Sequence, residues 1–399
     1  MTELRNEPLG YKIYGQEHIA ENATAQMDIA MRLPVSLAGA LMPDAHLGYG
    51  VPIGGVIATP ANIIIPGAVG VDIGCRMQLS VYPVPADMLD KNRAELKAML
   101  KNNTVFGTGA TNNRVTGTDK AHALFSRPEW KSNKVLSDLY NRAESQYGTS
   151  GSGNHFVEFG TIRAVGKSAI GNNNPDNLGL DLDDDLAYLA VLSHSGSRGF
   201  GAMVANHYTK LAERMGGLPE EAKKLSWLDL ETEENHNYWI AMNLAGDYAS
   251  GNHHEIHAKF AESLGMQPIV SIENHHNFAW LEKLEDGTSV MVHRKGATPA
   301  GKGVLGIIPG SMSTPGFVVS GKGNAASINS ASHGAGRNMG RNEAKRRLNP
   351  EDAKADLKSN NITLIGGSID EASAAYKDIH TVMAAQTELL NVLAEFRPS

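Results

Sequence analysis

Apolar and polar positions along the chain follow two periodicities, one typical of helices and one typical of strands. Apolar residues recur at helical spacing, which predicts helices, over 16–33, 87–100, 130–147, 200–215, 233–264, 334–348 and 370–396. Short runs rich in Val, Ile and aromatic residues predict strands within 51–84 and over 156–159, 187–192, 269–272 and 290–293. The asparagine-rich segment 171–177 is expected to form a turn-rich loop.

These strands and helices are mixed without the regular alternation of a parallel α/β protein, so we expect an α+β fold. Length alone suggests two or three domains for 399 residues. However, the chain shows no internal repeat, low-complexity tail or interdomain linker. We therefore expect a single catalytic domain over 1–399.

Composition and charge narrow the functional classes. Hydrophobic residues make up 41% and charged residues 20% of the chain, which is ordinary for a globular protein. The net charge of −7 excludes a globally basic nucleic-acid binder, so any nucleic acid must bind a local patch. No apolar run resembles a signal peptide or a membrane span. Together with the single cysteine, these features predict a soluble cytoplasmic protein without a membrane partner.

The single cysteine, Cys75, lies three residues after Asp72 in the segment Asp72-Ile-Gly-Cys75. Taken alone, this thiol is most simply a small buried hydrophobic residue, the usual role of a free cysteine. The alternative is a metal site, because the intervening Ile-Gly turn can aim a carboxylate and a thiolate at one ion. The rest of the chain favours the metal, since many of its 42 glycines cluster beside histidines, as in a site built from loops.

Six segments place a histidine, carboxylate or thiol beside Gly, Ser or Asn. They are the segments around Asp44 and His46, Asp72 and Cys75, His155, His194, His276, and His333. A large, polarizable thiolate can bridge two metals, and three of these histidines can complete two sites of low coordination number around it. Two metals so placed stabilise the attacking and leaving oxygens of phosphoryl transfer. Ligand softness alone favours Zn²⁺ over Mn²⁺ here.

His333 differs from the other histidines. It precedes Gly-Ala-Gly and a predicted helix with Arg337 and Arg341 at i,i+4, and a helix N-terminus with two arginines is typical of an anion site. A histidine at its edge can attack phosphorus as a nucleophile. Its other ring nitrogen then needs an acceptor, for which Asp44 is the candidate. The alternative is that Asp44 only caps a turn.

Two further motifs do not support a site of their own. The segment 296–303 is close to a P-loop but lacks the Ser or Thr after Lys302 that would hold Mg²⁺. The run His253-His-Glu-Ile-His257 has the wrong spacing for a metalloprotease helix. His253 and His257 are expected to be solvated on a polar helix face.

Taken together, the motifs resemble those of the RtcB family of RNA-splicing ligases. They are Asp-Ile-Gly-Cys, Gly-Asn-His-Phe, His-Ser-Gly-Ser-Arg, His-His-Asn and His-Gly-Ala-Gly-Arg, in this order. The resemblance runs from about residue 43 to about residue 376. It implies an RtcB-like α+β fold around a central metal-containing cleft. It also implies a ligase that uses GTP and two Mn²⁺ ions to join RNA with a 2′,3′-cyclic phosphate or 3′-phosphate to RNA with a 5′-hydroxyl.

The resemblance also implies a role for individual residues. Asp72, Cys75 and His155 resemble the ligands of one manganese, and Cys75, His194 and His276 those of the second. His333 matches the histidine that becomes guanylylated, with Asp44 orienting it. The implied GTP contacts are Asn154, Phe156, Glu158, Asn277, Pro309, Gly310, Ser311, Met312, Gly334, Ala335, Gly336 and Tyr376. Phosphate or RNA contacts are implied for Arg198, Arg337 and Arg341.

In the implied mechanism, His333 takes GMP from GTP, the RNA 3′-phosphate takes GMP from His333, and the 5′-hydroxyl then displaces GMP. A preceding metal-assisted hydrolysis opens any cyclic phosphate. The substrate is RNA in repair or tRNA splicing, and an activating protein partner is compatible with the resemblance.

The chain departs from the family pattern at three places. It ends in Phe396-Arg-Pro-Ser399 rather than a Lys-Gly tail, and Gly316 replaces an expected serine near the base. Both departures bear on the choice between GTP and ATP and suggest a repair-type paralogue. Arg76 follows Cys75 where a small residue is common.

Two other functions stay open at this point. A two-metal phosphoesterase acting on RNA 3′-phosphate or cyclic phosphate ends needs the metal ligands but not His333. A non-enzymatic RNA-binding or metal-sensing protein leaves the anion site beside His333 unexplained, and no basic or aromatic RNA-binding motif supports it.

Overall fold

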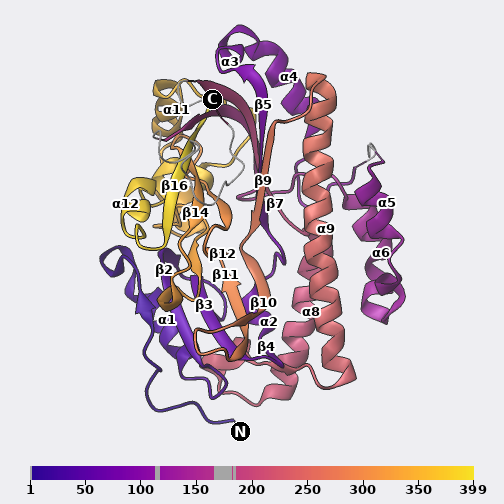
Figure 1. Cartoon of the computed structure of the whole chain (residues 1–399), viewed down its shortest axis with the longest axis vertical. Coiled ribbons are helices and arrows are strands. Elements are labelled where there is room, and N and C mark those ends of the chain that lie inside the picture. The colour runs from indigo at the N-terminus through magenta and orange to yellow at the C-terminus, as the bar shows by residue number, and fades with distance from the viewer. Residues whose placement is uncertain (1, 113–116, 166–181, 183–185) are drawn as a thin grey trace.

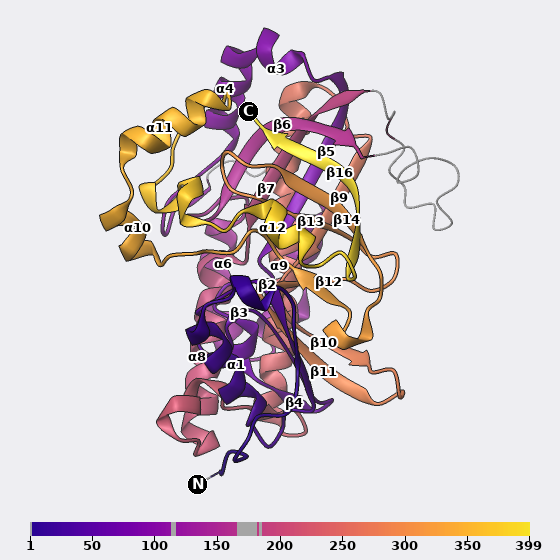
Figure 2. The same cartoon turned by 90° about the vertical axis from the view of Figure 1, so that its left-hand side faces the viewer.

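The computed structural model describes residues 2–112, 117–165, 182 and 186–399. The predicted loop over 171–177 lies outside these residues. Helices and sheets are both abundant, which confirms the expected α+β class (Figure 1). The N-terminal and C-terminal ends of the chain lie at opposite ends of the molecule (Figures 1 and 2). Within the described ranges, none of the helices combines the length and apolar character needed to cross a membrane.

A seven-stranded sheet in the order β13-β14-β16-β6-β7-β5-β9 carries most of the candidate metal ligands. Its strands are β5 (Arg76–Pro85), β6 (Phe156–Ala164), β7 (Ala187–Ser195), β9 (Val270–His275), β13 (Leu305–Ile308), β14 (Gly316–Gly321) and β16 (Leu390–Pro398). Every neighbouring pair is antiparallel. Antiparallel neighbours alternate in direction, so the start of one strand lies beside the end of the next.

A five-stranded sheet in the order β1-β2-β3-β11-β10 lies below it in Figure 1. Its strands are β1 (Lys12–Ile13), β2 (Ala38–His46), β3 (Ile53–Pro60), β10 (Asn277–Lys283) and β11 (Ser289–Lys295). Two small sheets pair β4 (Ile63–Ile64) with β8 (Leu228–Asp229) and β12 (Ala297–Pro299) with β15 (Ser330–Ser332). Because β9 ends at His275 and β10 begins at Asn277, the chain passes from one large sheet to the other at His276.

Helices cover the sheets, and the long α9 (Glu233–Leu264) runs along the seven-stranded sheet (Figure 1). The others are α1 (Glu21–Met31), α2 (Pro66–Val69), α3 (Met88–Lys91), α4 (Arg93–Asn103), α5 (Asp119–Phe125), α6 (Lys134–Gln146), α8 (Arg198–Gly216), α10 (Arg341–Arg347), α11 (Pro350–Ser359) and α12 (Ile379–Ala384). The Thr232 side chain caps α9 by accepting from the Asn235 amide, and Gly265 ends it in the left-handed conformation. Helix α9 therefore has the predicted bounds.

Aromatic side chains fill the core between α6, α8 and α9. Trp130 and Phe200 lie with ring centroids 4.9 Å apart, and Phe200 contacts Tyr248 at 5.4 Å. The buried Trp130 indole donates to the Leu124 carbonyl at 2.9 Å. This core stabilises the helical layer against which the metal-site strands pack.

Two helix predictions near the C-terminus are wrong. Only α10 forms within 334–348, because residues 334–340 are turns and bends and Gly336 has a positive φ of 71°. Glycine also has low helix propensity, so the segment does not begin a helix at Gly334. Within 370–396 the chain forms the short α12 and then β16, whose apolar residues join the seven-stranded sheet.

The prediction for His253 and His257 is also wrong, because both side chains are buried against the sheet. His253 is 0% exposed and His257 is 5% exposed. Ser193 on β7 lies 3.0 Å from His253 Nδ1 and 2.8 Å from His257 Nε2. Ser80 on β5 lies 2.7 Å from His257 Nδ1. These bonds satisfy His253 Nδ1 and both ring nitrogens of His257, which tertiary packing removes from water, and a helical pattern alone does not reveal them.

Candidate active site

The candidate metal ligands lie where four neighbouring strands of the seven-stranded sheet begin or end, on the same side of the sheet. His155 directly precedes β6, His194 lies near the end of β7, and Cys75 directly precedes β5. In the ladder, Phe156 is opposite His194. The His276 amide donates to the Cys75 carbonyl at 3.0 Å, which places the end of β9 beside the start of β5. The alternating strand directions therefore bring residues from distant parts of the chain to one point.

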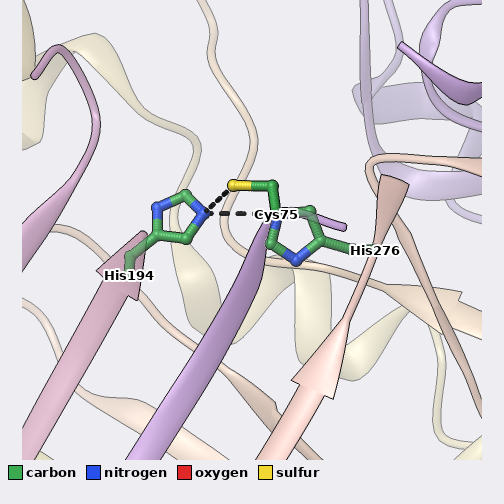
Figure 3. Close-up of side chains that lie close together, drawn as sticks. All are labelled: Cys75, His194 and His276. Carbon is green, nitrogen blue, oxygen red and sulfur yellow. Dashed lines mark hydrogen bonds between the residues drawn. The ribbon is translucent and has the colours of Figure 1, made fainter. Parts of the chain in front are cut away.

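Two groups of candidate ligands converge there, and Cys75 belongs to both. One group is Cys75, His194 and His276, and the other is Asp72, Cys75 and His155, with all ligand atoms of a group within 4.8 Å of one another. Cys75 Sγ lies 3.1 Å from His194 Nε2 and 3.4 Å from His155 Nε2. His194 Nε2 lies 3.2 Å from His276 Nε2. Figure 3 shows Cys75, His194 and His276 pointing toward one another.

Burial favours the uncharged forms of Cys75, His194 and His276. Burial raises the pKa of the Cys75 thiol, and the nearby Asp72 carboxylate raises it further. Burial lowers the pKa of His194 to about 3 and that of His276 well below its usual range. Neutral imidazole is the form that binds a metal, whereas the thiol must lose its proton on binding.

Asp72 is held by the loop that begins α8. Ser197 donates its amide to Asp72 Oδ1 at 3.0 Å, and Asp72 Oδ2 lies 2.9 Å from His155 Nε2. Although burial opposes ionisation, the hydrogen bond and charge of His155 lower the pKa of Asp72. Arg198 donates to His155 Nδ1 at 2.9 Å. The remaining ring proton of a neutral His155 is therefore on Nε2, facing Asp72, where a metal would replace it.

His333 lies beside this cluster and is held by Asp44. Its Nδ1 lies 2.6 Å from Asp44 Oδ2, and its amide donates to the same oxygen at 3.1 Å. Asp44 is fully buried, and although burial opposes ionisation, His333 lowers the pKa of this carboxyl. The His333 ring centroid is 4.8 Å from that of His276. Gly336 allows the close approach, because a Cβ there would lie 2.0 Å from the Asp44 carbonyl oxygen.

Arg337 and Arg341 do not form the open anion site predicted at a helix N-terminus. Arg337 pairs with Glu371 at 3.3 Å, and its guanidinium lies 5.0 Å from the centroid of the Tyr376 ring. Arg341 pairs with Glu371 and with Asp370, the latter at 2.9 Å. Because α10 begins only at Arg341, the prediction that one helix carries both arginines is wrong. A direct contact of either arginine with phosphate stays a prediction.

Two of the implied GTP contacts lie against the metal-ligand candidates. The Asn154 carbonyl accepts from His194 Nδ1 at 3.0 Å, and the Phe156 ring lies 5.9 Å from the His194 ring. Glu158 follows on β6. Asn277 instead connects backbone segments, since its side chain donates to the Asp72 carbonyl at 3.2 Å and accepts from an amide at 2.8 Å.

The other implied GTP contacts lie around His333. Residues 309–312 begin the loop that joins β13 to β14, and the Pro309 carbonyl oxygen is 3.3 Å from where a Cβ on Gly334 would stand. Tyr376 forms an isolated antiparallel bridge with Arg337. The loop, the turn after His333 and the segment around Tyr376 thus adjoin one another.

Lys295 is a candidate functional residue that the sequence motifs did not identify. It is 5% exposed, and its Nζ donates to the carbonyls of Tyr49 and Gly67. Its side chain passes 3.6 Å from where a Cβ on Gly70 would stand. Burial, together with Lys224, lowers the pKa of Lys295 to about 7. The available signal was a run of three basic residues ending an apolar strand at Lys295.

Glu158 gives this site a testable pH dependence. Burial raises its pKa to about 8, whereas an unperturbed glutamate titrates at about 4.3. Folding thus favours the protonated carboxyl, and this stabilisation is complete below the unfolded pKa and lost as pH rises through about 8. We expect Glu158→Gln to raise the Tm at about pH 9, with the gain over wild type shrinking toward about pH 5. Thermal melts across this range test it, and a gain independent of pH contradicts it.

Known proteins with related sequences show the family to which this chain belongs. A family model described as "tRNA-splicing ligase RtcB" matches residues 26–399. The chain is 35% identical to "RNA-splicing ligase RtcB1" of Escherichia coli strain ATCC 25922, and 34% identical to "RNA-splicing ligase RtcB" of strain K12. Both matches cover 90% of this chain and 88% of the relative. It is 30% identical to "tRNA-splicing ligase RtcB" of Thermococcus kodakarensis, over 90% of this chain and 86% of the relative. The chain therefore belongs to the RtcB family of RNA-splicing ligases.

Proposed function

We propose that this RNA ligase uses GTP and two Mn²⁺ ions to join RNA ending in a 2′,3′-cyclic phosphate or 3′-phosphate to RNA beginning with a 5′-hydroxyl. The observation that carries the proposal is the position of His333. Its ring is held by a buried carboxylate at 2.6 Å and stands 4.8 Å from the His276 ring of the ligand cluster. A phosphoesterase needs the metals but no such oriented nucleophile.

The residues around Cys75 fit two divalent metals. A thiolate, a carboxylate and three imidazoles supply three donors to each site when Cys75 is shared, which leaves positions open for phosphate oxygens. When bound, the metals supply positive charge that polarises the phosphates and stabilises attacking and leaving oxygens. The donor atoms suit Zn²⁺ as well, so the choice of Mn²⁺ rests on family membership.

Asp44 prepares His333 for attack. Because Asp44 accepts a hydrogen bond from the Nδ1–H group of His333, Nε2 carries the lone pair and is the attacking atom. Attack on the α-phosphorus of GTP forms a P–N bond and releases pyrophosphate. Asp44 then stabilises the positive charge on the imidazole, as a carboxylate does in a serine-protease triad.

The remaining steps transfer the same GMP group. Water first opens a cyclic phosphate, and an oxygen of the RNA 3′-phosphate then attacks the phosphorus of His333-bound GMP, which restores the free imidazole. The 5′-hydroxyl attacks the activated RNA phosphate, and GMP leaves. Asn154, Phe156, Glu158, the loop 309–312, Gly334–Gly336 and Tyr376 are proposed to hold the nucleotide. Arg198, which already contacts His155 at 2.9 Å, is proposed to meet an RNA phosphate.

Covalent guanylylation tests the nucleophile directly. With Mn²⁺ and α-³²P-labelled GTP, the wild-type protein should gain an acid-labile, base-stable label, and His333→Ala should abolish it. Asp44→Asn should keep the fold but slow labelling by about 100-fold or more, because the imidazole loses its orientation and charge partner.

Parallel reactions distinguish guanylylation of His333 from the alternative outcomes. ATP beside GTP tests the nucleotide preference. Label that persists in His333→Ala identifies another nucleophile. If no nucleotide labels the wild type while RNA cyclic phosphate is hydrolysed, the phosphoesterase replaces the ligase reaction proposed here.

The shared thiol predicts how metal content depends on single residues. Cys75→Ala should lower bound Mn²⁺ from two ions to none per chain, because it removes a donor from both groups. His155→Ala removes a donor from only one group and should first weaken that site. Elemental analysis after dialysis measures both variants. Retention of one tightly bound ion in Cys75→Ala contradicts a shared thiolate.

A further inference from the structure

Arg76 follows Cys75 directly, yet its side chain makes its contacts on α9 and β9 rather than on the ligand cluster. Its Nε donates to the Gly74 carbonyl at 3.3 Å and its Nη2 to the Gly246 carbonyl of α9 at 3.0 Å. Its Nη1 pairs with Glu273 of β9 at 3.1 Å. One guanidinium thus joins the turn that precedes Cys75 to a helix and to the neighbouring strand.

The turn and the helix approach each other at backbone distance. Gly74 has a positive φ of 67°, and a Cβ there would lie only 2.9 Å from the Gly246 Cα. Gly74 also donates its amide to the Asn277 carbonyl at 2.8 Å, and the Cys75 amide donates to the Asp72 carbonyl at 3.1 Å. The turn is therefore held on one side by the start of β10 and on the other by α9.

Glu273 extends the contact along α9. Ser250 donates to its carboxylate at 3.2 Å, and His254 Nε2 lies 3.8 Å from it. Gly246, Ser250 and His254 are each four residues apart and so share one face of the helix. Although burial opposes ionisation, His254 and then Arg76 lower the pKa of Glu273.

The burial of Arg76 in this pair points to a role beyond stability. The Arg76 side chain is 6% exposed and that of Glu273 is 34% exposed. A buried ion pair seldom stabilises a protein more than well-packed apolar residues would, because both charges lose water. The pair does, however, define the position of the Gly74 carbonyl, one residue from the shared thiol.

We propose that Arg76 and Glu273 are positioning residues that hold the Asp72–Cys75 turn against α9, so that Asp72 and Cys75 are aligned for metal binding. This role rests on the metal site of the proposed function. Neither residue is itself a ligand. The carbonyl contacts of Arg76 locate the turn, and Glu273 balances the guanidinium charge.

Cobalt binding tests the role without GTP, RNA or turnover. Co²⁺ titrated into the metal-free protein should produce a thiolate-to-cobalt absorption band in the wild type. Arg76→Met should weaken Co²⁺ binding by about 10- to 100-fold and reduce the band, as loss of residues that support metal ligands typically does. Arg76→Lys should recover part of the affinity, because an ammonium can reach a carbonyl but cannot span all three partners.

The double variant Arg76→Met with Glu273→Gln separates positioning from stability. Removing both charges should restore the Tm lost in either single variant, because no buried charge is left unpaired. Its Co²⁺ affinity should nevertheless stay low. If affinity returns together with Tm, the pair is only structural and the proposal is overturned.

The buried pair Arg294 and Glu282 is a matched control. Arg294 is 0% exposed and donates to both carboxylate oxygens of Glu282, but it lies on β11 rather than at the Cys75 turn. Arg294→Met with Glu282→Gln should leave the cobalt band unchanged. Wild-type affinity in Arg76→Met overturns the positioning role alone. Absence of any cobalt band in the wild type overturns both the role and the metal site. Failure to guanylylate with normal Co²⁺ binding overturns only the ligase mechanism.

Discussion

The close packing of imidazoles around one buried thiol is the constraint on which the rest of this site depends. Cys75 Sγ lies 3.1 Å from one histidine nitrogen and 3.4 Å from another, inside a region that excludes water. Polar groups so placed are costly unless they bond to one another or to an ion. Hydrogen bonds from the surrounding chain offset part of this cost. The Ser197 amide donates to Asp72, and the Asn154 carbonyl accepts from His194.

The two large sheets meet at the same place, which joins the candidate ligand cluster to His333. His276 lies at the junction of β9 and β10, so the same short segment belongs to both sheets. Asp44 on β2 of the second sheet then holds His333 at 2.6 Å. The candidate ligand cluster and His333 are therefore supported by one continuous backbone framework, and loops alone do not define their separation.

Helix α9 is the third element that supports the candidate site, because its polar side chains contact the strands beside it. Ser193 contacts His253 and His257 beneath β7, while Ser250 and His254 contact Glu273 beneath β9. Burying the polar face of a helix costs free energy unless its groups are hydrogen-bonded, and among these side chains His253 Nε2 lacks a partner within the described part of the chain. Here the pairing directs the helix to the strands that carry the ligands, at a fixed register.

The sequence by itself predicted the α+β class and the bounds of α9 correctly and identified the residues of the candidate site, because motifs and apolar periodicity are local properties. It also predicted that Asp44 would lie beside His333, through the need for an acceptor on the second ring nitrogen. It was wrong where glycines broke a helical pattern after His333 and where apolar residues at 390–398 joined a sheet. Only the tertiary structure decided that His253 and His257 are buried, that Arg337 and Arg341 are paired with carboxylates, and that Arg76 contacts α9. Those outcomes depend on which surfaces pack together, and packing between segments that are distant along the chain is not encoded in any local pattern.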